Sequence, residues 1–415
     1  MKLNRGQDEA IKHGNGPCMV LAPPGSGKTL IVTERTRYLI EESGVRPDQI
    51  LVITFTRYAA REMKERFERL TAGKNYPVTF GTFHSIFYGI LKCAYGIGAN
   101  NLMSEKESSV LLQEVLDQTN IESTPEVEDE EELVRELLRE VGMVKNGLCH
   151  LKDFHSKYLT QDEFAEVFRS YEHQKKELKK FDFDDMLVQC YALFRKKPEI
   201  LQGWQKRFQY ILIDEFQDIN RVQYEVIRML AAPRYNLFVV GDDDQSIYGF
   251  RGAKPELMLY MKQEFPSLRT ISLTVNYRST EFITGAAARV ILHNDTRFYK
   301  RVQSFRGRGQ NVHVQEVLDE LGDALPEDSV EEIKEIMSDL EGNMNKIEEN
   351  GNRASGIVRG ILLYSRGKDD EYIPTDLHGG GTAPAAEEKA EYRDEESEIH
   401  DMPPTETGRK KILVV

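Results

Sequence analysis

This 415-residue sequence has no long apolar run, no paired cysteines and no apolar N-terminal segment. No apolar stretch approaches the ~20 residues that a membrane span needs, so no membrane partner is expected. Residues 1–6 lack the apolar core of a signal peptide, and the four cysteines include no CxxC pair. Neither a disulfide framework nor a zinc site is therefore indicated, and the reducing cytoplasm is the expected location.

Positive charge is also scarce, since the formal net charge is −14, which at first argues against a nucleic-acid partner. Residues 319–415 hold 25 acidic and 11 basic residues, whereas residues 1–318 hold 44 of each. The acidity therefore belongs to the C-terminal part, and a basic groove in the first 318 residues is not excluded. The length predicts about two to four domains, and 40% hydrophobic with 30% charged residues is typical of a globular protein.

The most informative stretch is a glycine-rich loop at residues 22–29. It follows the apolar run 18–21, which indicates a short buried strand, and it precedes a helical pattern that begins at Leu30. This order is typical of a phosphate-binding loop, because backbone N–H groups and a helix N-terminus converge on the phosphate. Lys28 would reach the β- and γ-phosphates, and the Thr29 hydroxyl would bind Mg²⁺. The residues expected to bind the nucleotide here are Pro24, Gly25, Ser26, Gly27, Lys28 and Thr29. Ala22 replaces the usual first glycine, and an ordinary glycine-rich turn is the alternative.

Two further apolar strand patterns end in polar residues. The first, 210–213, ends in Asp214 and Glu215. Asp214 would hold Mg²⁺ through its water shell, and Glu215 would orient and deprotonate the attacking water. Carboxylates at such a place can instead cap a helix. The second pattern, 236–241, leads into residues 242–252, where Gln245 can contact the γ-phosphate while aromatic residues stack on bases.

Apolar, β-branched residues at 50–56 and 78–82 predict two more strands of the same parallel sheet. Phe55 lies at the end of one, and Thr82 and His84 lie at the end of the other, where ligands gather in open α/β sheets. Taken singly, each aromatic residue could equally be core packing. Residues 100–180 show no strand pattern and predict an all-helical insertion, whose lysines at 175–180 either contact phosphates or form surface charge.

These motifs, in this order and spacing, resemble the UvrD/PcrA/Rep-type superfamily 1 DNA helicases over residues 1–318. The resemblance implies an α/β fold with a RecA-like P-loop NTPase sheet, two RecA-like domains, and ATP with Mg²⁺ between them. It implies an ATP-dependent helicase or translocase acting on single-stranded DNA. Gln7 would contact the adenine, Tyr277 would stack on it, and Arg35 would lie near the nucleotide. Gln245 would sense the γ-phosphate, and Arg278 would be the first of two arginine fingers. The residues implied in the single-strand channel are Phe55, Thr82, His84, Tyr248, Phe250 and Arg251.

The resemblance also sets the expected domains. Residues 1–98 and 181–270 would form the first RecA-like motor domain, 99–180 the helical insertion, and 271–318 the start of a second motor domain. The motifs that complete the second domain, including the second arginine finger, do not follow. Because an arginine finger contributes roughly 10³–10⁵-fold in kcat in related systems, weak DNA-stimulated ATPase with little strand separation is expected.

After about residue 317 the sequence changes in character. Apolar residues spaced by three and four from Val330 to Ile361 predict a heptad seam. Residues 319–377 resemble a dimerisation helix of sensor histidine kinases, which predicts a homodimer through residues 328–365; an exposed helical hairpin is the alternative. Residues 378–410 predict a disordered linker, and 411–415 resemble the first strand of a receiver domain. A non-catalytic ATP- or DNA-binding module that dimerises through this tail is therefore the alternative function.

Overall fold

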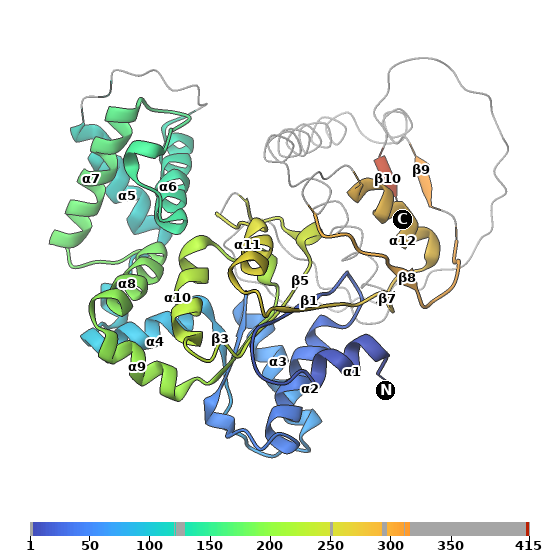
Figure 1. The fold of residues 1–415 in the computed structure, drawn as a ribbon. Helices are drawn as coiled ribbons and strands as arrows, with labels where there is room; N and C mark the ends of the chain where they lie inside the picture. Colours follow the sequence, from blue (N-terminus) through green and yellow to red (C-terminus); the bar gives the residue numbers. More distant parts are fainter. Residues whose placement is uncertain are drawn as a thin grey trace, which may run out of the picture.

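The computed structural model describes residues 3–119, 121, 129–249, 252–292, 297–310, 312–315 and 412–414. They form an α/β fold around a six-stranded sheet of order β3-β2-β4-β5-β1-β6 (Figure 1). The strands are β1 (Cys18–Leu21), β2 (Ile50–Thr54), β3 (Thr79–Thr82), β4 (Tyr210–Ile213), β5 (Leu237–Gly241) and β6 (Arg269–Ser272). All pairings in this sheet are parallel, so the predicted α/β class is confirmed.

Each face of the sheet has its own hydrophobic core, because consecutive strand residues point to opposite faces. Met19 of β1 belongs to the core that includes residues of α4 (Phe83–Tyr95), α8 (Phe183–Lys196) and α10 (Arg221–Ala231). Val20 belongs to the core beneath α1 (Arg5–Ile11), α2 (Lys28–Glu41) and α3 (Arg57–Leu70). Strands covered on both faces must be apolar throughout, which is why they appear as continuous apolar runs in the sequence.

The helical insertion projects from the α8 and α10 side of the sheet (Figure 1). It consists of α5 (Glu105–Gln118), α6 (Glu130–Gly147) and α7 (Gln161–Glu177), which share a core around Leu112, Leu137 and Phe164. Within the described parts of residues 99–180 no sheet strand occurs, so the all-helical prediction is confirmed there.

The lysines at 175–180 do not act as one group. Lys175 is 1% exposed and its ammonium lies among Glu172, Asp182 and Asp185. A side chain enclosed by three carboxylates can contact neither a nucleic-acid phosphate nor bulk solvent. Both alternatives considered for these lysines are therefore wrong for Lys175.

The predicted domain boundary between residues 270 and 271 falls inside β6. β6 pairs with β1, so it is an edge strand of the first sheet and not the opening of a second domain. The chain continues through β7 (Val275–Asn276), α12 (Glu281–Ile291) and β8 (Gln303–Ser304), and β7 pairs with β8. The predicted strand near the C-terminus is present as β10 (Ile412–Val414), paired antiparallel with β9 (His313–Gln315). The predicted seam, homodimer contact and linker fall on residues outside the described ones.

The helices α9 (Pro198–Arg207) and α11 (Glu256–Glu264) also pack against the core on one face of the sheet. The six-stranded sheet and the helices packed on it are called the sheet-bearing domain below. In the part of the chain that the structure describes, no helix combines the length and the apolar character needed to cross a membrane.

Candidate active site

The predicted phosphate-binding loop joins β1 to α2. Gly25 and Gly27 have φ angles of 69° and 94°, in the left-handed region that glycine adopts without a Cβ clash. The Ser26 hydroxyl donates to the Pro23 carbonyl at 2.6 Å and closes the turn. α2 begins at Lys28, directly after this turn. A left-handed glycine turn at a helix N-terminus is a geometry that binds phosphate.

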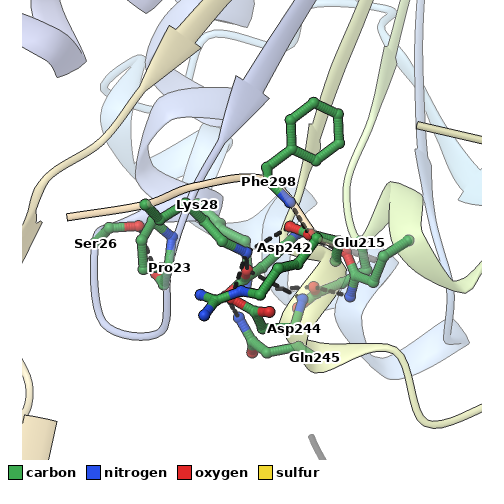
Figure 2. A network of polar contacts seen from close by, with 12 residues as sticks. Pro23, Ser26, Lys28, Glu215, Asp242, Asp244, Gln245 and Phe298 are labelled. Atoms are coloured by element: carbon green, nitrogen blue, oxygen red, sulfur yellow. Dashed lines mark hydrogen bonds and ion pairs between the residues drawn. The ribbon is translucent and has the colours of Figure 1, made fainter. Parts of the chain in front are cut away.

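The predicted carboxylates lie at the same edge of the sheet as this loop. Lys28 Nζ is 3.4 Å from Glu215 Oε2, and Figure 2 shows the two residues close together. Glu215 follows β4, and β5 lies between β4 and β1 in the sheet, so the lysine side chain reaches past the end of β5. Glu215 has a φ of 53°, and such strained backbone in a non-glycine residue clusters at functional sites.

Asp214 is the more deeply placed carboxylate of the pair, with 6% of its surface exposed. Burial and the neighbouring Glu215 raise the pKa of Asp214 to about 7, and Lys28 opposes this shift. Two close carboxylates favour binding of a divalent cation, which would neutralise their repulsion. Carboxylate and hydroxyl oxygens are the donors that Mg²⁺ prefers, so Asp214 and Thr29 fit the predicted ion.

Gln217, which the sequence analysis did not single out, connects the carboxylates to the segment after β5. Its Nε2 donates to Glu215 Oε2 at 2.9 Å, and its Oε1 accepts from the Asp242 backbone N–H at 3.0 Å. Asp242 Oδ2 in turn accepts from Gln245 Nε2 at 2.7 Å. Gly241 allows this approach, because a Cβ there would lie 2.9 Å from Gln217 Oε1. The predicted base and the predicted sensor thus belong to one hydrogen-bonded chain (Figure 2).

Gln7 and Tyr277, the predicted adenine contacts, meet the loop from two different segments. Gln7 Nε2 donates to the Ser26 carbonyl at 2.9 Å, and its Oε1 accepts from the Asn4 N–H at 3.1 Å. The Asn4 side chain donates to the Tyr277 hydroxyl at 2.8 Å, and the Tyr277 N–H donates to the Gly25 carbonyl at 2.9 Å. The structure therefore brings these residues together beside the loop.

Arg278 also lies against the loop. Asn276 Oδ1 accepts from the N–H groups of Arg278 and Ser279, at 2.8 and 2.9 Å, and turns the chain there. A Cβ on Gly25 would lie 2.5 Å from Asn276 Oδ1 and 2.6 Å from Arg278 Cβ. The close approach of this turn requires glycine at position 25.

Two of the predicted contact residues, Arg35 and Thr82, make structural hydrogen bonds. The Arg35 guanidinium donates to the carbonyls of Ile11 and His13, at 3.0 and 2.6 Å, and is 2% exposed. Burial lowers the pKa of Arg35 to about 10. Thr82 is the N-cap of α4: its hydroxyl accepts from the Ser85 N–H at 3.2 Å and it too is buried. Arg35 therefore fixes the turn before β1, and Thr82 caps a helix.

The predicted stacking residues form two ring pairs. The Phe55 and Tyr248 rings lie 4.6 Å apart between centroids, and the His84 ring lies 5.8 Å from that of Phe183. Phe183 is 45% exposed and was missed in the sequence, where an aromatic residue between two aspartates was the available signal. Phe250 and Arg251 fall outside the described residues.

Comparison with known proteins places most of the chain in one family. Residues 3–266 match the UvrD/REP helicase N-terminal domain. YjcD of Bacillus subtilis (strain 168) is 39% identical over 344 residues, which is 81% of this chain and 43% of YjcD. The ATP-dependent DNA helicase PcrA of Staphylococcus aureus (strain Mu50) is 36% identical over 327 residues, which is 78% of this chain and 44% of PcrA. The chain thus spans less than half the length of these relatives. The comparisons support the helicase resemblance and not the signalling-helix or receiver resemblance. The chain belongs to the UvrD/REP helicase family.

Proposed function

We propose that the chain binds ATP with Mg²⁺ at residues 22–29 and hydrolyses it in response to single-stranded DNA. The Lys28–Glu215 contact carries this proposal, because it places the lysine that would bind the phosphate next to the carboxylate that would act as the base. In the proposed site Lys28 and the loop N–H groups bind the phosphates, and Glu215 orients the attacking water and takes its proton. Mg²⁺, held by Thr29 and Asp214, would neutralise charge on the phosphate oxygens.

The groups around this centre have supporting roles in the proposal. Gln245 contacts the γ-phosphate, and Gln7 with Tyr277 holds the adenine. Arg278 extends from the turn packed on Gly25 and neutralises charge that develops on the phosphates during transfer. The names of the PcrA relatives, which describe ATP-dependent DNA helicases, support a nucleotide-dependent function.

The proposed DNA surface consists of Phe55, His84, Phe183 and Tyr248. Partly exposed aromatic rings offer stacking platforms for bases, and stacking tolerates any sequence because every base has a π face. This makes single-stranded DNA the expected ligand. Homodimerisation through residues 328–365 stays a prediction, which sedimentation with and without residues 319–415 would test.

ATPase assays with and without single-stranded DNA test the proposal on three variants. Lys28→Ala should lose nucleotide affinity, whereas Glu215→Gln should bind the nucleotide normally and lose turnover. Lys12→Ala removes a solvent-exposed lysine and is the control. The same assays check the expected weak turnover of the 415-residue chain, and an unwinding assay on a DNA duplex checks its limited strand separation. Unchanged nucleotide affinity in Lys28→Ala would contradict the proposal, and turnover no higher than in Glu215→Gln would favour a non-catalytic module.

A further inference from the structure

Three consecutive aspartates after β5 hold a buried lysine from a distant segment. The Lys300 side chain is 3% exposed, and its ammonium contacts the carboxylates of Asp242, Asp243 and Asp244, with Nζ 2.7 Å from Asp244 Oδ2. The side chains of Asp242 and Asp243 are also buried, with 1% and 6% of their surfaces exposed. Charge-assisted hydrogen bonds in such a low-dielectric place are strong and directional.

Two neighbours of Lys300 join the same aspartates. Arg297 Nη2 donates to Asp244 Oδ2 at 2.8 Å, and the Phe298 backbone N–H donates to Asp243 Oδ2 at 2.6 Å. Residues 297–300 follow α12, so these contacts fasten that segment to the end of β5. Burial alone would lower the pKa of Lys300, but the three carboxylates raise it above its usual value, so the lysine stays charged.

Asp242 connects Lys300 to the candidate active site through hydrogen bonds. One of its carboxylate oxygens accepts from Lys300, and the other accepts from Gln245 Nε2 at 2.7 Å. Its backbone N–H donates to Gln217, which donates to Glu215 at 2.9 Å. A shift of Lys300 would therefore reach the sensor through one residue and the base through two.

We propose that Lys300 is a positioning residue that couples the segment after α12 to Gln245 and Glu215 through Asp242. The inference rests on the proposed ATPase function and deepens it, because it names what aligns the hydrolysing groups. Lys300 acts through the aspartates that it contacts. The ammonium group of Lys300 already occupies the place between the three carboxylates where a metal ion would bind. The cluster therefore joins two segments of the chain.

The test uses the full 415-residue chain with Lys300→Met, Lys300→Arg and, as the matched control, Arg301→Met, which removes an exposed cation one residue away. Three quantities are measured: affinity for a fluorescent ATP analogue, affinity for single-stranded DNA with and without a non-hydrolysable ATP analogue, and DNA-stimulated turnover. Lys300→Met should bind the nucleotide like the wild type but lose about 10- to 100-fold in kcat, because small misplacements of catalytic groups have effects of this size. The influence of the nucleotide on DNA affinity should also disappear. Lys300→Arg should retain part of the wild-type kcat and part of the effect of the nucleotide on DNA affinity. Arg301→Met should resemble the wild type in both quantities.

The double variant Lys300→Met/Asp244→Asn removes one charge of each sign and provides a second folded form without the lysine. Wild-type kcat and wild-type coupling of nucleotide to DNA in either folded variant would overturn the inference. Failure of both variants to melt cooperatively would assign Lys300 to stability alone and would overturn it as well. If the wild type itself shows no DNA-stimulated turnover, it is the proposed function that fails, so the two failures are distinguishable.

Discussion

The replacement Lys175→Met should weaken the attachment of the helical insertion to the domain that contains the six-stranded sheet. Lys175 Nζ, 2% exposed at the side chain, lies 2.5 Å from Asp182, 2.7 Å from Asp185 and 2.7 Å from Glu172. Lys145 Nζ meets the same three carboxylates at 2.7, 2.6 and 2.9 Å. These residues come from α6, α7 and the start of α8, so the cluster joins the insertion to the helix packed on the sheet. Without Lys175, one ammonium faces three carboxylates.

We expect Lys175→Met to lower the free energy of unfolding by about 3–5 kcal/mol, because breaking a buried ion pair leaves an uncompensated charge. Methionine preserves most of the apolar stem of Lys175 and removes the ammonium group, whose Nζ lies 4.7 Å from the Tyr171 ring centroid, so the change reports mainly on charge. Burial raises the pKa of Asp185, Lys145 opposes the shift, and loss of Lys175 would raise the pKa further. A carboxyl whose folded-state pKa is raised destabilises the fold increasingly as pH rises above its ordinary value of about 3.9. The deficit of the variant should therefore be smaller at acidic pH than at neutral pH.

Urea denaturation followed by circular dichroism, at acidic and at neutral pH, measures the loss of unfolding free energy and its dependence on pH. Lys176→Met, which removes the exposed neighbouring lysine, is the control and should stay within about 0.5 kcal/mol of the wild type. The double variant Lys175→Met/Asp185→Asn should recover part of the loss, since contacting residues are not additive. If Lys175→Met unfolds at the same urea concentration as Lys176→Met, the ion cluster does not hold the insertion and the reasoning is wrong.

Three further predictions concern the candidate active site. Gly25→Ala should weaken binding of an ATP analogue at least about tenfold. The left-handed φ alone costs roughly 1–2 kcal/mol, and the added Cβ displaces the turn at 276–278. The control Gly14→Ala, whose added Cβ meets nothing within 4 Å, should leave the affinity unchanged in the same titration. Phe55→Ala should weaken single-stranded DNA binding by roughly 1–3 kcal/mol in a fluorescence anisotropy titration, with Tyr95→Ala, an exposed aromatic at the far end of α4, unchanged. Arg35→Met should lower thermal stability without changing the nucleotide affinity of the folded protein. A reduced affinity would instead show that Arg35 contributes to nucleotide binding.

The features that sequence predicted well depend on local pattern. Strands buried on both faces must be apolar, and a turn that wraps phosphate must contain glycine, so β1, β4, β5 and the loop at 22–29 were predictable. The insertion was predictable as helical for the same reason, since its apolar spacing follows the helix period. The burial of Lys175 was not predictable, because it lies among four nearby lysines, a pattern that indicates surface charge. Its burial depends on Asp182 and Asp185, which only tertiary packing brings to it.

Arg35 shows why position in a motif does not give the direction of a side chain. It lies seven residues after Lys28 on α2, nearly two helical turns and therefore on a similar face. α2 returns along β1, so this spacing carries Arg35 about 10 Å away from the loop towards the amino end of the strand. There the carbonyls before β1 meet its guanidinium. The distance along the helix, and not the residue type, decides which partner Arg35 has.

The position of β5 between β1 and β4 determines how the candidate site is held together. Strands lie about 4.8 Å apart, so the loop after β1 and the base after β4 are separated by roughly 10 Å. The Lys28 side chain spans this gap and reaches Glu215, and the Asp242 backbone N–H, directly after β5, donates to Gln217. Glu215 and Gln245 therefore share one support, Asp242, although they follow different strands. Two groups with a common support respond together to whatever moves it, and the contact that Asp242 makes with Lys300 comes from outside the six-stranded sheet.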